Sequence, residues 1–354
     1  MIFATGLDGL KFQRLSEHSS LADLVSLPIS TLRNIGLTAR QAELLALHGQ
    51  RRADVALEWL DQSTSHHAVT FHDPRYPPLL KQIKHPPLLL FVKGQAELLP
   101  RQQLAMVGTR QPTPTGRKVA QNFAAELVQQ GYMITSGMAR GIDSESHKGA
   151  LQGGGFTIAV LGHGLQQIYP ASNRALAEQI MASGALVSEF FPDVQARAEF
   201  FPQRNRIVVG LSSATIVVEA AMKSGSLISA NLAAEYSRDV FAVPGPIYSR
   251  QSAGCHWLIQ QGAKLVTSVA DILEEWQFFA QNGVSTLAFS EKKSAPDLFA
   301  QQMLANVGDD ATAIDIIAER SNMSVTDVSI TLLQLEIAGE VAAVPGGYIR
   351  VRSA

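Results

Sequence analysis

Residues 104–141 contain the sequence LAMVGTRQPTPTGRKVAQNFAAELVQQGYMITSGMARG, in which two short apolar runs flank one helical segment. The first run covers residues 104–107 and is followed by a helical pattern from Gly116. The second run covers residues 133–135 and ends in a glycine-rich turn. An apolar run followed by an amphipathic segment is typical of one β-α unit in a parallel sheet. This part of the chain therefore predicts an α/β fold.

The same alternation continues toward the C-terminus. Further apolar runs occur at residues 157–161, 185–187, 215–218, 240–243 and 264–266, with helical patterns between them. Such a long series of β-α units predicts an extended Rossmann-like core, a doubly wound and mostly parallel sheet.

The rest of the chain divides around this core into three further regions. We expect a small helical domain of helix-hairpin-helix or SAM-like type over residues 1–70, and the Rossmann-like core over residues 71–280, entered through a proline-rich connector at 71–100. A polar linker is predicted at 281–296. Two helical patterns and a glycine-turned strand pair predict a winged-helix-like domain over 297–354.

Composition limits the classes of function. The 354 residues include 29 Lys and Arg against 31 Asp and Glu, so a net charge of −2 gives no general attraction to nucleic acid. Any nucleic-acid site must be local. Cys255 is the only cysteine, which excludes an internal disulfide and a cysteine metal cage. We expect a cytoplasmic protein without a membrane span, because no apolar segment reaches about 18 residues.

Glycines, hydroxyls and cations follow the predicted strands. Ligands of an open parallel sheet bind outside the carboxyl ends of its strands, where phosphate oxygens accept hydrogen bonds from backbone amides, hydroxyls and arginine. The candidate residues at these positions are Gly108, Thr109, Arg110, Ser136, Gly137, Arg140, Gly141, Lys223, Ser224, Gly225 and Ser226. This pattern predicts a phosphate-binding edge.

Two segments without acidic residues narrow the kind of ligand expected at this edge. No Asp or Glu occurs from Leu98 to Ala125, or from Phe200 to Val218. The second segment combines Arg204, Asn205 and Arg206 with Phe200 and Phe201. Cations that follow phosphates and rings that stack on bases are what a single strand requires. For the two phenylalanines, simple packing against the core is an equally good explanation.

Five motifs together resemble one family, the DNA-processing protein A (DprA, or Smf) family. They are VGTR at 107–110, SGMARGID at 136–143, FPQRNRI at 201–207, EAAMKSGSLI at 219–228 and VFAVPG at 240–245. The resemblance covers roughly residues 70–275. It implies a cytoplasmic homodimer that binds single-stranded DNA, protects incoming DNA during natural transformation and loads the RecA recombinase, without cofactor, metal or catalytic turnover.

The resemblance also implies individual DNA contacts. They fall on Arg110, on the Ser136–Gly137 turn and on Asn205 and Lys223. One position departs from the family pattern: Tyr169-Pro170 is followed by Ala171 where many relatives have lysine. Arg174 offers a cation nearby and is included among the candidate DNA-binding residues.

Other functions compete with the binding of single-stranded DNA. A phosphoribohydrolase-like nucleotide enzyme could use Glu189 or Glu219, although the Pro-Gly-Gly turn of such enzymes is absent. A dehydrogenase is disfavoured because no G-x-G-x-x-G follows the first strand. Asp143 and His147 could form an acid-base pair or hold a metal, but Asp143 as a helix N-cap is the simpler interpretation.

A transcription factor that uses the tail is also disfavoured. Residues 297–354 contain three arginines, no lysine and eight acidic residues, and 3 minus 8 gives −5. The candidate recognition helix, Val325 to Ala338, has no cation, whereas a groove-reading helix should be basic. We therefore expect the tail to make protein contacts.

Overall fold

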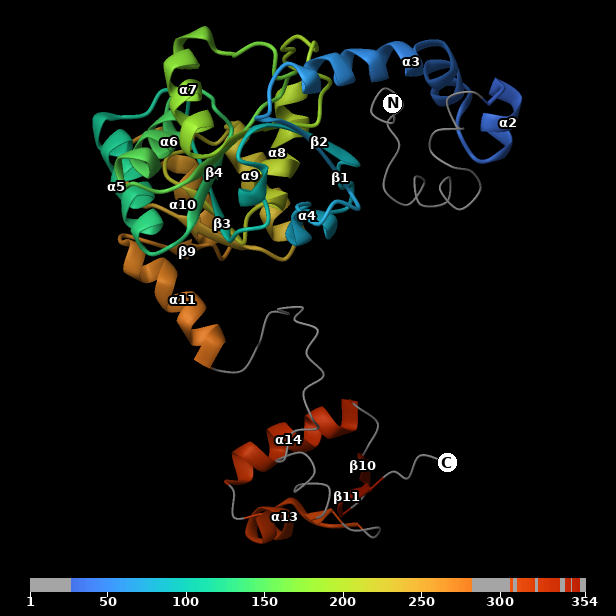
Figure 1. Cartoon of the computed structure of the whole chain (residues 1–354). Helices are drawn as coiled ribbons and strands as arrows, with labels where there is room; N and C mark the ends of the chain where they lie inside the picture. The colour runs from blue at the N-terminus through green and yellow to red at the C-terminus, as the bar shows by residue number, and fades with distance from the viewer. Residues whose placement is uncertain are drawn as a thin grey trace. The chain divides into compact units, whose positions relative to one another are not determined.

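The computed structural model describes residues 27–281, 306–307, 311–321, 324–337, 341–344 and 346–350 of the chain. The chain divides into two compact units, Met1–Asn282 and Gly283–Ala354. Each unit has its own hydrophobic core among the described residues. Figure 1 draws both units.

A nine-stranded sheet forms the centre of the first unit. Its strand order is β1-β2-β6-β5-β4-β3-β7-β8-β9. The strands are β1 (His66–Thr70), β2 (Leu89–Gly94), β3 (Gln103–Val107), β4 (Met133–Ser136), β5 (Thr157–Val160), β6 (Ala185–Ser188), β7 (Ala214–Val217), β8 (Asp239–Ala242) and β9 (Lys264–Leu265). The seven strands from β6 to β9 in this order are parallel, and β1 and β2 extend one side in antiparallel fashion. The predicted mostly parallel sheet is confirmed.

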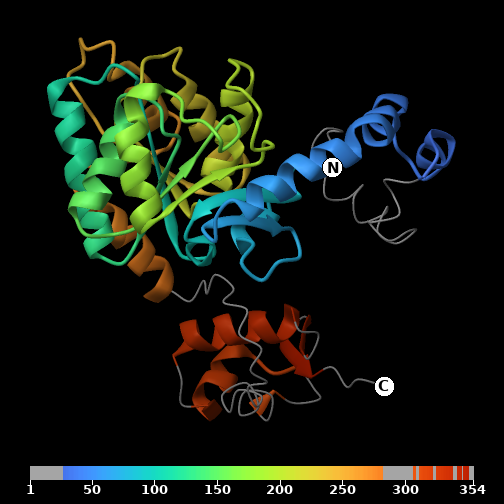
Figure 2. The same ribbon diagram turned by 45° about the horizontal axis from the view of Figure 1, so that its top comes forward.

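Helices cover both faces of the sheet (Figures 1 and 2). They are α4 (Pro78–Lys81), α5 (Pro114–Gln129), α6 (Ile142–Gln152), α7 (Arg174–Ser183), α8 (Phe200–Gly210), α9 (Gly225–Glu235), α10 (Ala253–Gln260) and α11 (Val269–Gln281). Alternate side chains of β3 reach opposite faces. Leu104 and Met106 pack in the cluster that includes α5, α6 and α11, whereas Ala105 and Val107 pack in the cluster that includes α8, α9 and α10.

Helices α2 (Ile29–Asn34) and α3 (Ala39–Asp61) precede the sheet. Gly36 turns the chain between them with a φ of +103°, and Thr38 and Gln41 form a capping box at the start of α3. A helical N-terminal region was predicted, but its proposed end at residue 70 is displaced, because β1 pairs with β2 in the sheet. The predicted connector at 71–100 likewise contributes β2, which pairs with β6.

The second unit contains α13 (Ile314–Ser321), α14 (Val325–Ile337) and the antiparallel hairpin of β10 (Val341–Val344) and β11 (Gly347–Arg350). Ile317, Val328, Leu332 and Val341 form its core. The predicted order of helix, helix and strand pair is confirmed. The predicted linker at 281–296 lies outside the described residues, except for Gln281 at the end of α11.

Candidate nucleic-acid interface

A groove of about 740 Å³ lies at the carboxyl edge of the sheet, beside the ends of β3 and β7. From β3 the chain builds the sheet in one direction through β4, β5 and β6, and it then returns to the other side of β3 with β7. This change of direction separates the loops that follow the two strands and leaves an opening between them. The fold therefore places a concave site at this point.

Backbone contacts fix the loops around the groove. The Thr109 amide donates to the Glu219 carbonyl at 2.7 Å, and the Thr109 carbonyl accepts from the Ile142 amide at 3.1 Å. Thr109 thus joins the loop after β3 to the end of β7 and to the start of α6. The wall opposite includes the N-terminus of α9, where the Ser224 hydroxyl accepts from the Ser226 amide at 3.2 Å. A helix N-terminus carries partial positive charge.

Many of the predicted site residues come together here. The lining includes Gly108, Thr109, Arg110, Arg204, Asn205, Lys223, Ser224, Gly225 and Ser226. Gly225 is exposed, and a Cβ added there would have no heavy atom within 4 Å. A ligand can therefore approach the backbone of Gly225 closely. At Gly108, by contrast, an added Cβ would meet the Ile142 side chain at 2.5 Å, so this glycine serves packing against α6.

The structure does not bring the other predicted residues into the groove. They are Ser136, Gly137, Arg140, Gly141, Arg174 and Arg206, none of which belongs to its lining. The buried Ser136 hydroxyl donates to the Met106 carbonyl at 2.6 Å. Arg206 forms an ion pair with the buried Glu189. Arg140 and Arg174 are exposed outside the lining, and Gly141 caps α6 with a φ of +82°.

Arg204 lines the groove but is only 4% exposed. Its Nη1 donates to the Val160 carbonyl at 2.7 Å. Gly137 lies directly on the guanidinium, because a Cβ added to Gly137 would be 1.8 Å from Nη1. Burial lowers the pKa of Arg204 to about 10, and the charge of Asp143 opposes this effect. Gly137 therefore contributes by making room for a buried arginine beneath the groove.

Asp143 is a buried carboxyl group whose charge interacts with that of Arg204. Burial raises the pKa of Asp143, while Arg204 and the Ala139 amide, which donates to the carboxylate at 3.3 Å, oppose the rise. The expected N-cap role is wrong, since Gly141 holds the N-cap position of α6 and Asp143 lies in its first turn. Among the described residues, no group of three His, Cys, Asp or Glu side chains is arranged to hold a metal.

Arg110, an exposed cation of the groove, lies against an aromatic ring. The Arg110 guanidinium is 5.8 Å from the centre of the Phe201 ring, and that ring is 5.8 Å from the Tyr169 ring. Phe201 and Tyr169 both line the groove. Phe200 instead packs on Phe190, with ring centres 4.5 Å apart. Of the two explanations weighed for the phenylalanines, ligand contact thus suits Phe201 and packing suits Phe200.

Several lining residues were not predicted. Tyr169, Gln111, Arg197 and Gln251 belong to loops that reach the groove from different parts of the chain. Tyr169 enters the sequence analysis only as part of the Tyr-Pro pair, although its place after the third strand of the core is a signal for a ring at this edge. No local pattern marks Arg197 or Gln251, because loop residues have no periodicity.

Glu189 and Glu219, the candidate carboxylates of a nucleotide enzyme, both bind other side chains of the protein. Glu189 binds Arg206, and its pKa is raised by burial. Glu219 accepts from the Thr113 amide at 2.9 Å and from the Thr113 hydroxyl at 2.5 Å, and so holds the start of α5. The carboxylate in the described lining is that of Asp143, which lies beside Arg204. This arrangement disfavours general acid-base chemistry in the groove.

Comparison with known families identifies the chain. A family model described as DNA recombination-mediator protein A matches residues 67–277, more than half of the chain. The chain belongs to the DprA/Smf family. A second model, the DprA winged helix domain, matches residues 290–347, so the second unit is the winged-helix domain of this family.

Relatives of the DprA/Smf family match over most of the chain. The Smf protein of Escherichia coli K12 is 45% identical over 327 residues, covering 91% of this chain and 87% of its own. The DNA processing protein DprA of Streptococcus pneumoniae is 47% identical over 210 residues, covering 58% of this chain and 73% of its own.

Two solved structures are also similar. The X-ray structure of DprA from Streptococcus pneumoniae has a TM-score of 0.66 at 37% identity, covering 77% of this chain and 95% of its own. DprA from Helicobacter pylori, whose structure was described for its unique single-stranded DNA binding mode, has a TM-score of 0.55 at 30% identity, covering 60% and 96%. No described helix of the present chain is long and apolar enough to cross a membrane.

Proposed function

We propose that this DprA/Smf protein binds single-stranded DNA along the groove at the carboxyl edge of its sheet. The observation that carries the proposal is the pairing of Arg110 with the Phe201 ring, beside the N-terminus of α9. Arginine and helix amides suit phosphates, and exposed ring faces suit bases without regard to sequence. Binding of single strands by the Helicobacter pylori relative supports the same assignment.

The charge of the groove supports an anionic ligand. Arg204 and Asp143 compensate each other beneath its surface, whereas Arg110 and Lys223 form no ion pair with a carboxylate in the described part of the chain. Both exposed cations are therefore available to phosphates. Duplex DNA does not offer free base faces, so we expect single strands to be preferred.

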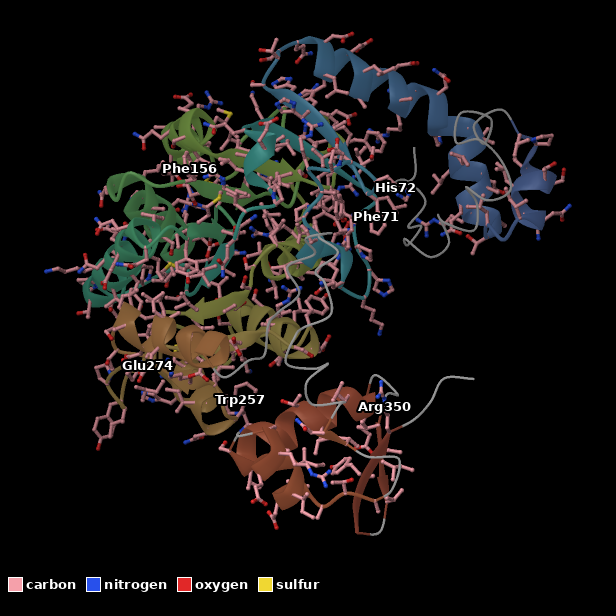
Figure 3. All side chains as sticks on the ribbon, turned by 60° about the horizontal axis from the view of Figure 1, so that its bottom comes forward. Phe71, His72, Phe156, Trp257, Glu274 and Arg350 are labelled. Carbon is pink, nitrogen blue, oxygen red and sulfur yellow. The ribbon has the colours of Figure 1, made fainter. Side chains whose placement is uncertain are left out.

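The test compares two arginines that flank β3, one at each end of this β-strand. Arg110 follows β3, and Arg101 precedes it and lies 5.3 Å from the Phe156 ring, which is labelled in Figure 3. Fluorescence anisotropy of a labelled oligo-thymidine strand, in a salt series with duplex as competitor, should show binding about tenfold weaker for Arg110→Ala. Arg101→Ala is the matched control and should bind as the wild type. Equal affinities for all three proteins would place the DNA elsewhere.

As a recombination mediator, the protein should protect incoming single strands and load RecA recombinase onto them during natural transformation. The family assignment supports this role. Because loading requires the strand to be held first, Arg110→Ala should fail to promote RecA filaments on strands coated with a single-strand-binding protein, while Arg101→Ala should promote them normally.

The family resemblance further supports a homodimer. The surface we favour is formed by the last strand and helix of the core, within roughly residues 236–273, where a cavity of about 340 Å³ is lined by α9, α10, β8 and β9 and by no residue of the loop between β8 and α10. It includes Trp257, labelled in Figure 3, and β9 is the edge strand of the sheet. Light scattering measures the oligomeric state directly.

A further inference from the structure

The loop after β8 exposes two large apolar side chains to solvent. It runs from Gly245 to Ser252 and connects β8 to α10. Ile247 is 76% exposed and Tyr248 is 95% exposed. Tyrosine is usually buried over much of its ring, so a ring presented this fully marks a contact surface more readily than a packing position. Nothing in the core described above uses Tyr248.

Hydrogen bonds hold both ends of this loop in place. His256 Nε2 lies 2.9 Å from the Gly245 carbonyl oxygen at the start of the loop. At its end, the Gln251 carbonyl accepts from the Ala220 amide at 2.8 Å, and Gln251 Nε2 donates to the Gln111 carbonyl at 3.2 Å. Gln111 directly follows Arg110. The loop is therefore tied to the β3 loop that carries the main groove cation.

The loop continues the groove at the same edge of the sheet. β8 runs parallel to β7, and β7 runs parallel to β3, so the loops that follow the three strands leave the sheet in one direction. Two strand spacings, about 10 Å, separate the carboxyl ends of β3 and β8. Gln251 belongs to the groove lining, and Tyr248 lies three residues before it. A single DNA strand that leaves the groove toward β8 therefore reaches this loop next.

The charge of this segment favours a polyanion. No Asp or Glu occurs from Val240 to Ala270, and Arg250 is exposed two residues after Tyr248. The segment thus offers an exposed ring and, two residues further along the sequence, an exposed arginine, the two residue types that Phe201 and Arg110 bring together inside the groove. This combination binds a base and its neighbouring phosphate without selecting a sequence.

We propose that Tyr248 stacks on a base of the DNA strand beyond the groove, with Arg250 at the adjoining phosphate. The loop thereby forms a second subsite that lengthens the footprint of the protein on single-stranded DNA. This inference rests on the proposed function of the groove. It predicts that Tyr248 contributes to the binding of strands that extend beyond the groove, and not to the binding of a strand short enough to lie within it.

The experiment measures the affinity of the full chain for oligo-thymidine strands of about 5 and about 15 nucleotides, lengths that bracket common single-strand site sizes. Tyr248→Ala should weaken binding of the longer strand on the order of tenfold and leave the shorter one unchanged. Tyr248→Phe keeps the ring and should bind both strands normally. Leu47→Ala, which alters a 70% exposed apolar side chain of α3, is the control for loss of exposed surface.

The outcomes separate this proposal from that for the groove. If Arg110→Ala weakens both strands while Tyr248→Ala weakens neither, the groove assignment stands and the second subsite is refuted. If the wild type binds neither strand, both proposals fail. If Tyr248→Ala instead changes the mass of the free protein in light scattering, with unchanged DNA affinity, the loop contacts a protein and the proposal is overturned.

Discussion

At the scale of single residues, the two arginines of the groove have different tasks. Arg110 is exposed and lies against Phe201, whereas Arg204 is buried beside Asp143 and donates to the Val160 carbonyl. An exposed guanidinium can exchange water for a phosphate at little cost, whereas the Arg204 guanidinium is enclosed by protein and its Nε is buried without a hydrogen-bond partner among the described residues. Arg110 is thus suited to ligand binding, and Arg204 to positioning the loop after β4.

Removal of the buried cation should destabilise the fold. Arg204→Met leaves the Asp143 carboxylate buried without its counter-charge, and we expect the free energy of unfolding to fall by about 3–5 kcal/mol. Urea denaturation at neutral pH measures the loss. The double variant Arg204→Met with Asp143→Leu should recover a large part of it, because no unpaired charge remains. A loss below about 1 kcal/mol for the single variant would contradict the assigned role.

At the scale of elements, strand ends and helix starts are joined by side chains as well as by backbone. Glu219 follows β7 and binds Thr113, whose hydroxyl accepts from the Gly116 amide at 3.0 Å at the start of α5. The position of α5 therefore depends on a carboxylate from a distant part of the sequence. The same residue is one of the two candidates for catalysis in the nucleotide-enzyme alternative.

A conservative change at this contact distinguishes the two roles. Glu219→Gln keeps the shape but removes the charge from the link to Thr113, and the free energy of unfolding should fall by about 1–2 kcal/mol. The affinity for single-stranded DNA should remain within about twofold, since Glu219 does not line the groove. Thermal unfolding and anisotropy give both values. Loss of a nucleotide-hydrolysing activity in this variant would instead support the enzyme alternative.

At the scale of the whole molecule, two units with separate cores share one chain. The basic groove belongs entirely to the first unit, and the acidic tail region belongs to the second. Acidic residues repel phosphates, so the winged-helix domain is suited to a protein partner.

This division predicts the behaviour of a shortened chain. A protein ending at residue 281 retains the sheet and every residue of the groove lining, and it should bind oligo-thymidine with an affinity within about threefold of the full chain. The control is the same truncation with Arg110→Ala, which should lose binding. An affinity that drops by more than about tenfold on truncation would show that the tail takes part in holding the strand.

The sequence by itself determined the class of the fold and the edge of the sheet at which the site lies. Apolar runs of strand length, separated by helical patterns, allow few arrangements other than a parallel doubly wound sheet, and the residues after each run must then meet at its carboxyl edge. Arg110 and Lys223 could be predicted in this way, and Asn205 from the segment without acidic residues and the family motif. The strands β1 and β2 could not, because the five prolines between them predict an irregular connector rather than paired strands.

Only the tertiary structure decided which candidate residues reach the groove surface. Arg204 and Arg206 belong to the same short motif as Asn205, yet Arg204 is buried under Gly137 and Arg206 is paired with Glu189. Tyr169, Gln251 and the exposed Tyr248 come from separate loops. The sequence indicates which loops follow which strands. Whether a side chain in such a loop is free to bind DNA depends on its burial and its ion pairs. Both depend on groups that the fold brings together from distant parts of the chain.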